Sequence, residues 1–230
     1  MSNRDVLGAL EATYGPQLAN WPTDAYEFLV WWHCGYPASD ERCAKGWESL
    51  RRAVGIGPEQ LLAASPSKLA SALKPGGMVP ELRAMRLKEI AERVQSEFGG
   101  DLLGALRAMP LDRARKALKK FSNIADPGAD RILLFAGISP IAAIPSNCPH
   151  VLVRIELGAE RENYGVTYKE AQRMIEAAVP AKFEGRQRAY LLLKVHGQQT
   201  CKLKNPKCST CAVAERCAFA AEKTRGRAVS

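Results

Sequence analysis

The sequence lacks any apolar run that approaches the length of a membrane span, and its polar start, MSNRDVLGALEATYG, has no signal-peptide pattern. It also lacks internal repeats, low-complexity segments and any sustained alternation of apolar and polar residues with the period of a strand. The first absence argues against a membrane-spanning protein, and the last argues against a fold built on sheets. We therefore expect a cytoplasmic protein, nucleoid-associated in a bacterium, whose thiols stay reduced.

What the sequence has instead is a series of short helical patterns. Its 230 residues are 47% hydrophobic, which is enough for one large core or two small lobes. Apolar residues recur at the spacing of an amphipathic helix in five stretches, 25–32, 83–98, 112–121, 169–178 and 186–196. Pro and Gly stand between these stretches. The pattern predicts an all-α fold.

The net charge of +9 is concentrated in two segments. Residues 107–120 carry six Lys or Arg against one Asp, and residues 182–207 carry seven against one Glu. These segments hold more than the whole excess, so the rest of the chain is slightly acidic. Concentrated positive charge attracts polyanions, because it neutralises phosphates and releases counterions. Charge alone is equally compatible with nucleic-acid binding and with solvated helix faces that have no partner.

Four cysteines near the C-terminus stand at the spacing C-x6-C-x2-C-x5-C: Cys201, Cys208, Cys211 and Cys217. In a cytoplasmic chain, reduced thiols this close together are better explained as metal ligands than as disulfides. Structural zinc usually takes two C-x2-C-like knuckles, and this stretch has one, whereas a [4Fe–4S] cluster is held by four Cys from uneven loops. The spacing therefore favours a [4Fe–4S] cluster over zinc or disulfides. The other cysteines are scattered singly and are expected to be small buried residues: Cys34, Cys43 and Cys148.

Residues 111–137 are predicted to form two helices joined by a tight turn. The first helix is basic and amphipathic, and the second, which starts at Pro127, is apolar. Asp126 is a good N-cap before a proline at the first helical position, and Asn123 tolerates the left-handed backbone of a tight turn. Ile124 is expected to point into the core. This pattern is typical of a helix-hairpin-helix motif and also of an ordinary αα-corner.

A hairpin of this kind followed by this cysteine spacing resembles the helix-hairpin-helix/GPD superfamily of base-excision DNA glycosylases, and within it endonuclease III. Residues 26–40 (YEFLVWWHCGYPASD) match the family's early helix and the loop that enters DNA. Residues 77–90 resemble its G-x-K-A-x-x-I segment, with Arg-Ala where Lys-Ala is usual. Residues 179–183 (VPAKF) and 196–201 (HGQQTC) match the approach to the cluster.

The resemblance implies two helical lobes and DNA between them. One lobe would be a barrel of helices from residue 22 to 140 that carries the hairpin at 111–137. The other would be residues 1–21 plus 141–225, with the [4Fe–4S] cluster at 201–217. Damaged double-stranded DNA would lie across the cleft between the lobes, bound by a monomer, with the damaged nucleotide turned out of the stack.

The resemblance also implies which residues contact DNA. Tyr36 would stack in the gap left by the extruded base, where Pro37 replaces the usual polar inserter. Lysines in the cysteine loop would face phosphates, so that the cluster holds a basic loop in a fixed shape. The expected contacts lie in the early loop, the hairpin and the cysteine loop: Tyr36, Pro37, Lys119, Lys120, Asn123, Ala125, Lys202, Lys204 and Lys207.

The catalytic positions of the family are not matched. The lysine that bifunctional members use to attack the sugar falls on Pro127, which has no amine. The family's aspartate is missing too, since nothing between Asp130 and Glu156 is acidic, and Asn147 is its expected occupant. An amide orients a water but takes no proton from it, and it brings no charge to a developing cation. The sequence therefore predicts no Schiff-base lyase activity through the family position.

Three functions remain open on the sequence. A monofunctional DNA glycosylase would use Asn147 at the family position or an acid–base group from elsewhere, with Asp126, Asp130, His150 and Glu156 as candidates. A non-catalytic reader of damaged or unusual DNA would keep the scaffold without the chemistry. A redox or sensor protein would use the cluster and share only the fold.

Overall fold

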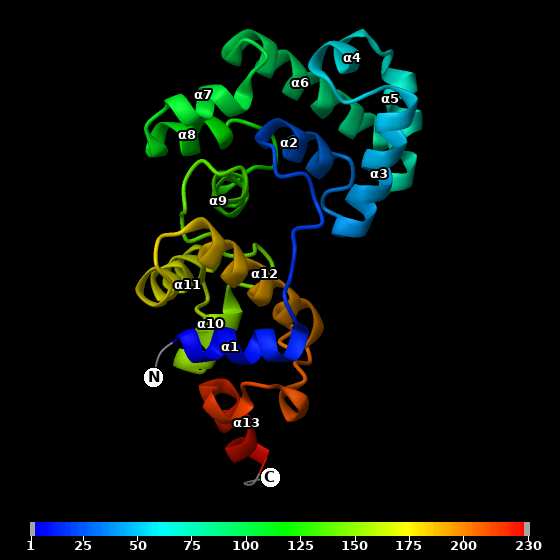
Figure 1. The fold of residues 1–230 in the computed structure, drawn as a ribbon. Helices are drawn as coiled ribbons and strands as arrows, with labels where there is room; N and C mark the ends of the chain where they lie inside the picture. The colour runs from blue at the N-terminus through cyan, green and yellow to red at the C-terminus, as the bar shows by residue number, and fades with distance from the viewer. Residues whose placement is uncertain (1–2, 228–230) are drawn as a thin grey trace. The chain divides into compact units, whose positions relative to one another are not determined.

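The structure is a computed structural model that describes residues 3–227, with side chains from residue 6 to residue 224. Within this range it contains thirteen α-helices, three short 3-10 helices and no strand (Figure 1). The predicted all-α fold is confirmed. None of the helices in the described range combines the length and the apolar character that crossing a membrane requires.

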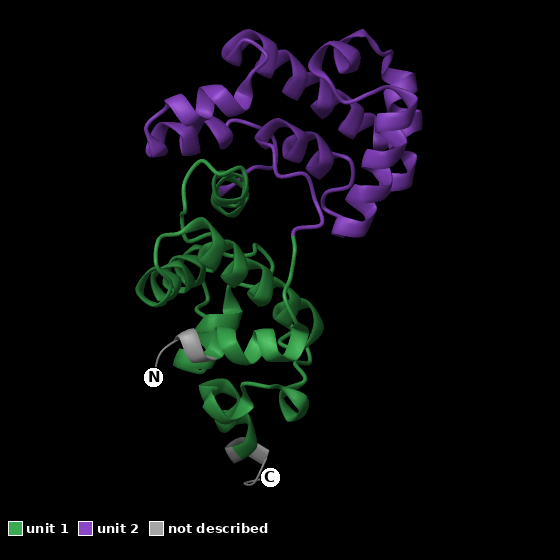
Figure 2. Ribbon diagram, in the orientation of Figure 1, with its two compact units in different colours: residues 1–18, 126–230 green, residues 19–125 purple. Residues whose placement is uncertain are grey.

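The chain divides into two compact units (Figure 2). Unit 1 is residues 1–18 and 126–230, and unit 2 is residues 19–125. The division implied by the resemblance places the second boundary later, after residue 140. In the structure the helix at this boundary, α9 (Asp126–Phe135), packs against α12 (Phe183–Gln199), which belongs to unit 1.

Unit 2 consists of seven α-helices and one 3-10 helix: α2 (Ala25–His33), α3 (Asp40–Ala53), α4 (Pro58–Ala63), α5 (Pro66–Leu73), η1 (Lys74–Gly76), α6 (Pro80–Phe98), α7 (Leu102–Ala108) and α8 (Leu111–Leu118). Side-chain caps start several of them. Asp24 accepts two backbone N–H groups at the start of α2, and Ser39 and Asp101 cap α3 and α7. The long helix α6 packs against α2, α4, α5 and α7, so it forms the centre of the unit.

Unit 1 consists of six α-helices and two 3-10 helices: α1 (Asn3–Tyr14), α9 (Asp126–Phe135), α10 (His150–Leu157), α11 (Tyr164–Ala178), α12 (Phe183–Gln199), η2 (Cys208–Thr210), η3 (Ala214–Arg216) and α13 (Ala218–Arg227). Its core joins α1, α10, α11 and α12, with Leu10, Val151 and Leu192 fully buried. The N-terminal helix therefore completes a core that is otherwise built from the second half of the chain.

All five predicted helical stretches lie in helices of the structure, with different ends. Helix α6 begins at Pro80, and the first hairpin helix, α8, ends at Leu118 rather than continuing to residue 121. It ends there because the N–H of Lys120 donates to the carbonyl of Ala117, an i→i−3 bond that tightens the last turn. The three single cysteines are buried, as predicted.

Candidate functional site

The four cysteines of the 201–217 segment line one small cavity in unit 1. The short helices η2 and η3 position three of these cysteines. Cys208 begins η2, Cys211 follows η2, and Cys217 follows η3. Most of the remaining wall is apolar, including Ile155, Val213, Phe219 and Ala220. The structure therefore brings together all four predicted ligands.

The four cysteines can be compared with what two kinds of metal site require. In the part of the chain that the structure describes, no three or more His, Cys, Asp or Glu side chains are grouped so as to hold one metal ion. A zinc ion draws four thiolates to about 2.3 Å from a single point. Each cysteine of a [4Fe–4S] cluster instead binds a different iron atom of the cube. The structure places the four cysteines around a common cavity, and which metal group they hold stays a prediction.

Burial makes these thiols poor acids on their own. It raises the pKa of Cys201 to about 11 and also raises the pKa values of Cys211 and Cys217. Neighbouring cysteines add to the shift, because thiolates repel one another. Coordination to a metal removes the proton from a thiol outright. The thiols of this segment are therefore expected to lose their protons when they bind a positively charged metal centre.

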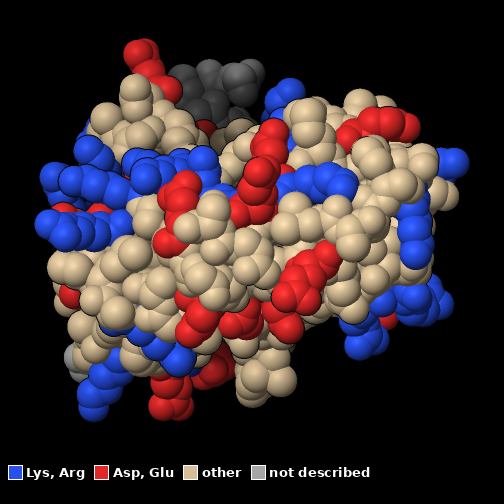
Figure 3. All heavy atoms as spheres, turned by 90° about the horizontal axis from the view of Figure 1, so that it is seen from above, with Lys and Arg blue, Asp and Glu red and all other residues tan. Residues whose placement is uncertain are grey.

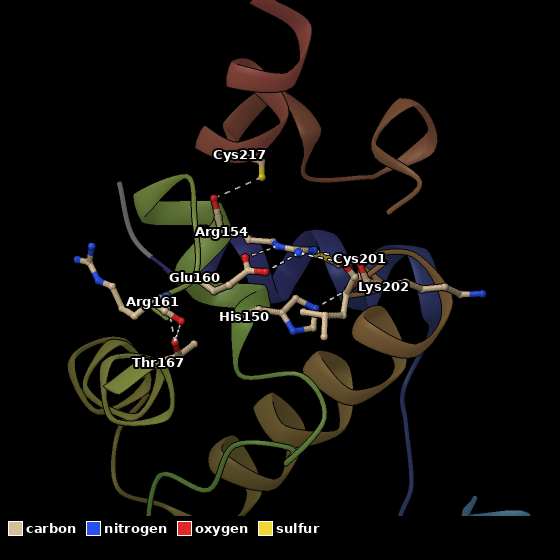
Figure 4. A network of polar contacts seen from close by, with 9 residues as sticks. His150, Arg154, Glu160, Arg161, Thr167, Cys201, Lys202 and Cys217 are labelled. Carbon is tan, nitrogen blue, oxygen red and sulfur yellow. Dashed lines mark hydrogen bonds and ion pairs between the residues drawn. The ribbon is translucent and has the colours of Figure 1, made fainter. Parts of the chain in front are cut away.

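A buried arginine holds the backbone next to the first cysteine (Figure 4). Arg154, on α10, donates from Nη1 to the carbonyl of Lys202 at 3.0 Å and from Nη2 to that of Leu203 at 3.1 Å. Its Nε and Nη2 also donate to the carboxylate of Glu160, each at 2.8 Å. The guanidinium carbon lies 4.6 Å from the ring centroid of Phe219, and the side chain is only 4% exposed. Arg154 thus fixes two successive carbonyl groups after Cys201.

Two histidines and a tyrosine hold the other side of this segment. His150 Nε2 lies 2.7 Å from the carbonyl of Cys201 and must donate to it, since a carbonyl only accepts. The hydroxyl of Tyr14, on α1, lies 2.9 Å from His196 Nδ1 and 2.7 Å from Thr200 Oγ1. Burial lowers the pKa of His196 to about 4, so its ring is neutral at pH 7. The cysteine segment is therefore tied to α1, α10 and α12.

The loop between the first two cysteines presents lysines outward. The N–H of Lys207 donates to the carbonyl of Thr200 at 3.0 Å and closes the loop at its base. Asn205 turns the chain with a positive φ of 53°. The lysines predicted to face phosphates, Lys202 and Lys204, are exposed, as is Lys207. The loop is a closed, basic turn on the surface of unit 1.

The predicted hairpin turn has the expected backbone. Asn123 has a φ of 58°, in the left-handed region, and Ile124 is buried. Lys119 and Lys120 are exposed just after α8, and Ala125 is exposed just before α9. In the view from above in Figure 3, Lys and Arg side chains gather on the side where α7 and α8 lie in Figure 1. The turn thus combines exposed residues with local positive charge.

The early loop after α2 carries a stacked aromatic pair. The rings of Trp32 and Tyr36 lie 4.5 Å apart at an interplanar angle of 26°. The Tyr36–Pro37 peptide bond is cis, and Pro37 is exposed. Tyr36 therefore rests on Trp32 beside an exposed turn of the same unit.

The candidate acid–base groups have different surroundings. Asn147 is exposed, and its Oδ1 accepts from the thiol of Cys148 at 3.3 Å. Asp126 is half-buried at the start of α9, and Glu156 is exposed on α10. Asp130 is fully buried, and its Oδ2 accepts from Tyr168 and Gln172 at 2.8 and 2.9 Å. His150, the remaining candidate, is buried and contacts the carbonyl of Cys201.

No family model matches the chain. A thymine/uracil-DNA glycosylase from Pyrobaculum aerophilum is 27% identical over 179 residues, which are 77% of this chain and 73% of that protein. An endonuclease III solved in a non-covalent complex with DNA superposes with a TM-score of 0.73 over 96% of both chains, at 16% identity. A thermostable thymine-DNA glycosylase superposes with a TM-score of 0.72 over 96% of this chain and 97% of that one, at 19% identity.

The chain has the fold of the helix-hairpin-helix DNA glycosylases. The resemblance to this superfamily that the sequence indicated is confirmed by the fold and by the sequence likeness together. In the glycosylase fold of this chain, the hairpin turn lies at 119–125 and the four-cysteine segment at 201–217. The roles of individual residues in DNA contact and catalysis stay predictions.

Sequence reasoning missed the residues that support the cysteine segment. Arg154 is the only Lys or Arg in the largely apolar stretch HVLVRIEL, and a cation on a buried helix needs a partner. Nothing in the sequence indicates that the partners are Glu160 and two carbonyl groups of the cysteine loop. Tyr14 lies 182 residues from His196 and carries no local signal of this contact.

Proposed function

We propose that this chain is a DNA glycosylase of base excision repair that binds damaged duplex DNA as a monomer. The observation that carries the proposal is the sequence likeness to a thymine/uracil-DNA glycosylase over most of the chain, on top of the shared fold. Fold alone does not define an activity, so the likeness in sequence matters. By this analogy a uracil or thymine base in a mismatched pair is the first substrate class to test.

Duplex DNA would be held by backbone and basic groups from both units. In unit 2, the hairpin turn offers the exposed residues Ser122 and Asn123 and the charges of Lys119 and Lys120. In unit 1, the closed loop that carries Lys202 and Lys204 adds a second cationic patch. Such contacts bind phosphates in any sequence and make affinity fall steeply with salt.

The cysteine segment would hold a [4Fe–4S] cluster through Cys201, Cys208, Cys211 and Cys217, which line one cavity. When bound, the cluster supplies four iron–thiolate bonds that cross-link this segment. Arg154 and His150 fix the carbonyl groups beside Cys201. They keep the lysine loop in one shape, so the ligands and their supports serve DNA binding.

The chemistry would be hydrolytic, without a covalent intermediate. A Schiff base needs an amine at the family lysine position, and Pro127 has none. The amide of Asn147 accepts and donates hydrogen bonds and so can orient a water molecule. Asp126 is the partly exposed carboxylate nearest the hairpin in sequence. We assign the glycosylase a monofunctional mechanism with a slow chemical step.

A non-catalytic reader of damaged DNA is the second candidate, because one observation favours it. No residue between Asp130 and Glu156 is acidic. Asp130, at the start of this stretch, is fully buried and accepts hydrogen bonds from Tyr168 and Gln172. A buried carboxylate of this kind is not placed to activate a water for a nucleotide. A reader would bind lesions selectively and leave the glycosidic bond intact.

The test is a panel of duplexes with single uracil, mismatched thymine, hypoxanthine or alkylated bases. We expect base release that is revealed as strand breaks only after alkali treatment, with no adduct trapped by borohydride. Asp126→Asn and Asn147→Ala variants serve as controls for the chemical step. Lesion-selective binding with no base release from any duplex would instead establish the reader. A trapped adduct in the unmodified protein would show that another lysine attacks the sugar.

A further inference from the structure

His33, the last residue of α2, has a carbonyl group at each of its two ring nitrogens. Nδ1 lies 2.7 Å from the carbonyl of Leu29, and Nε2 lies 2.8 Å from the carbonyl of Ser122, 89 residues away. The side chain is buried. All these groups belong to unit 2, and Ser122 is part of the hairpin turn.

Both contacts can be hydrogen bonds only when the ring is a cation. A carbonyl oxygen accepts and never donates, so each ring nitrogen must carry a proton to bond to it. A neutral imidazole has one N–H, which leaves one nitrogen lone pair facing an oxygen lone pair. The position of His33 at the C-terminus of α2, where the helix dipole is negative, also favours the cation. The observed geometry is that of the imidazolium form.

The surroundings of His33 oppose this charge at neutral pH. Burial lowers the pKa of His33, while its hydrogen bonds to Leu29 and Ser122 act in the opposite direction. The charged groups that act on it are both on α6: Arg86, which lowers its pKa, and Glu89, which raises it. Helices α3 and α7 also pack against α2, and neither contributes a charged group to this set among the described residues. The second N–H is therefore gained only at a pH below the ordinary pKa of a histidine, which is about 6.5.

A permanent cation holds the same turn from another helix. Arg93, on α6, donates to the carbonyl of Lys120 and lies over the ring of Phe121, with its guanidinium carbon 5.6 Å from the centroid. Arginine stays charged at every pH at which the protein is folded. The hairpin turn thus has one restraint that does not titrate, Arg93, and one that does, His33.

We propose that His33 is a positioning residue that fastens the hairpin turn to the end of α2 when its ring is protonated. Because the early loop begins directly after His33, the same contact links the two predicted DNA-contacting segments of unit 2. Protonation therefore makes this interface more rigid and strengthens duplex binding in mildly acidic solution. The part that concerns DNA rests on the proposed function, and the part that concerns the hairpin does not.

The protonation state is read directly by ring-nitrogen NMR, which is simple because the chain has three histidines. The spectrum of His33 is assigned by its loss in His33→Gln. We expect one ring proton at about pH 7.5 and two, both slowly exchanging, at about pH 5.5. A ring that keeps a single proton down to about pH 5 would overturn the proposal, whatever the variants do.

The restraint on the turn is read by hydrogen exchange of residues 119–125, corrected for the intrinsic effect of pH. In the parent protein we expect protection to rise about threefold or more from pH 7.5 to pH 5.5, as a charge-assisted bond forms. His33→Gln keeps one donor and should lose this rise. Arg93→Ala is the matched control, and it should lower protection at both pH values while the rise persists. An equal rise in His33→Gln contradicts the proposal.

Duplex affinity at constant salt tests the consequence for DNA. We expect the gain in affinity between the two pH values to be about threefold larger in the parent than in His33→Gln. Equal gains in the two proteins would overturn the role of His33 in the interface. If neither protein bound DNA at either pH, the proposed function would fail, and the exchange data would still decide whether His33 fastens the turn.

Discussion

The cysteine segment and the expected catalytic positions differ in how fully the structure supports them. Around the cysteines, Arg154, His150 and Tyr14 make close polar contacts from two different helices. At the positions predicted for the family's lysine and aspartate the chain has Pro127 and Asn147, and Asn147 is exposed. The contacts that hold the cysteine segment therefore include neither of the residues at the predicted catalytic positions.

The largest expected effect comes from the cysteine ligands. The protein purified without air should contain about four iron and four sulfide per chain. Cys208→Ser or Cys211→Ser should lose the cluster and loosen unit 1, because ligand binding is coupled to folding of the segment. Iron and sulfide analysis with absorption spectra measures the first effect, and hydrogen exchange of α12 measures the second. Cys34→Ala, in unit 2, should retain the cluster. Stoichiometric zinc without sulfide in fresh protein contradicts this prediction.

The second-largest effect is expected at Asn147, the residue predicted to occupy the family's aspartate position. If Asn147 occupies the family's aspartate position, Asn147→Asp restores a negative charge near the developing cation. One charge at about 4 Å and an effective dielectric near 20 contributes about 4 kcal/mol. This corresponds to roughly a thousandfold in rate. Single-turnover base release measures it. Unchanged release in Asn147→Asp would show that the family position lies at another residue.

The contacts that Arg154 makes to the cysteine segment can be removed without changing any of the four cysteines. Arg154→Met leaves Glu160 and two carbonyl groups without their buried cation, and we expect a loss of about 3 kcal/mol in the free energy of unfolding of unit 1. Arg188→Met is the matched control, since Arg188 pairs with Glu11 at 2.7 Å with both side chains more than a third exposed. That variant should lose less than about 1 kcal/mol. Denaturant unfolding followed by exchange of α10 compares them, and equal losses would contradict the role of Arg154.

A smaller effect is expected from the surface of the same loop. The triple change of Lys202, Lys204 and Lys207 to Ala should weaken binding to all duplex sequences alike. It should also flatten the dependence of log affinity on log salt by about three units, one for each lost phosphate contact. Titrations at several salt concentrations measure both quantities. The same lysines changed to Arg should restore binding, and a triple Ala variant that binds as the parent does would remove the loop from the interface.

The smallest effect is a dependence of stability on acid. The hydrogen bonds from Arg154 hold the pKa of Glu160 below its usual range. A carboxylate whose pKa is lowered by folding contributes stability above its unfolded pKa and loses it as the pH falls through the folded value. The stability difference between the parent and Glu160→Gln should therefore be full at neutral pH, decrease as the pH falls below the unfolded value of about 4.3, and be lost once the pH is below the lowered folded value. A difference that stays constant down to about pH 3 would show that Glu160 does not stabilise the protein through its ion pair with Arg154.

Much of the fold and of the cysteine site follows from local sequence. The helical periodicity of the five stretches, the left-handed turn at Asn123 and the burial of Ile124 depend on neighbouring residues, and the structure confirms them. The cysteine spacing indicates a common site because the four thiols lie within one short segment. The periodicity predicts a later end for α8 than the structure has, because side-chain periodicity does not report the backbone bond that tightens the final turn.

Only the tertiary structure decided which polar groups meet across the chain. His33 reaches the hairpin turn 89 residues away, and Tyr14 reaches His196 across 182 residues. Arg154 finds its carbonyl partners 48 and 49 residues later in the chain. The sequence alone determined the helices, the turn and the cysteine set, because spacing along the chain controls each of them. The long-range contacts depend on how helices pack, since burial forces each charged or polar group to take whichever partner the neighbouring helix presents.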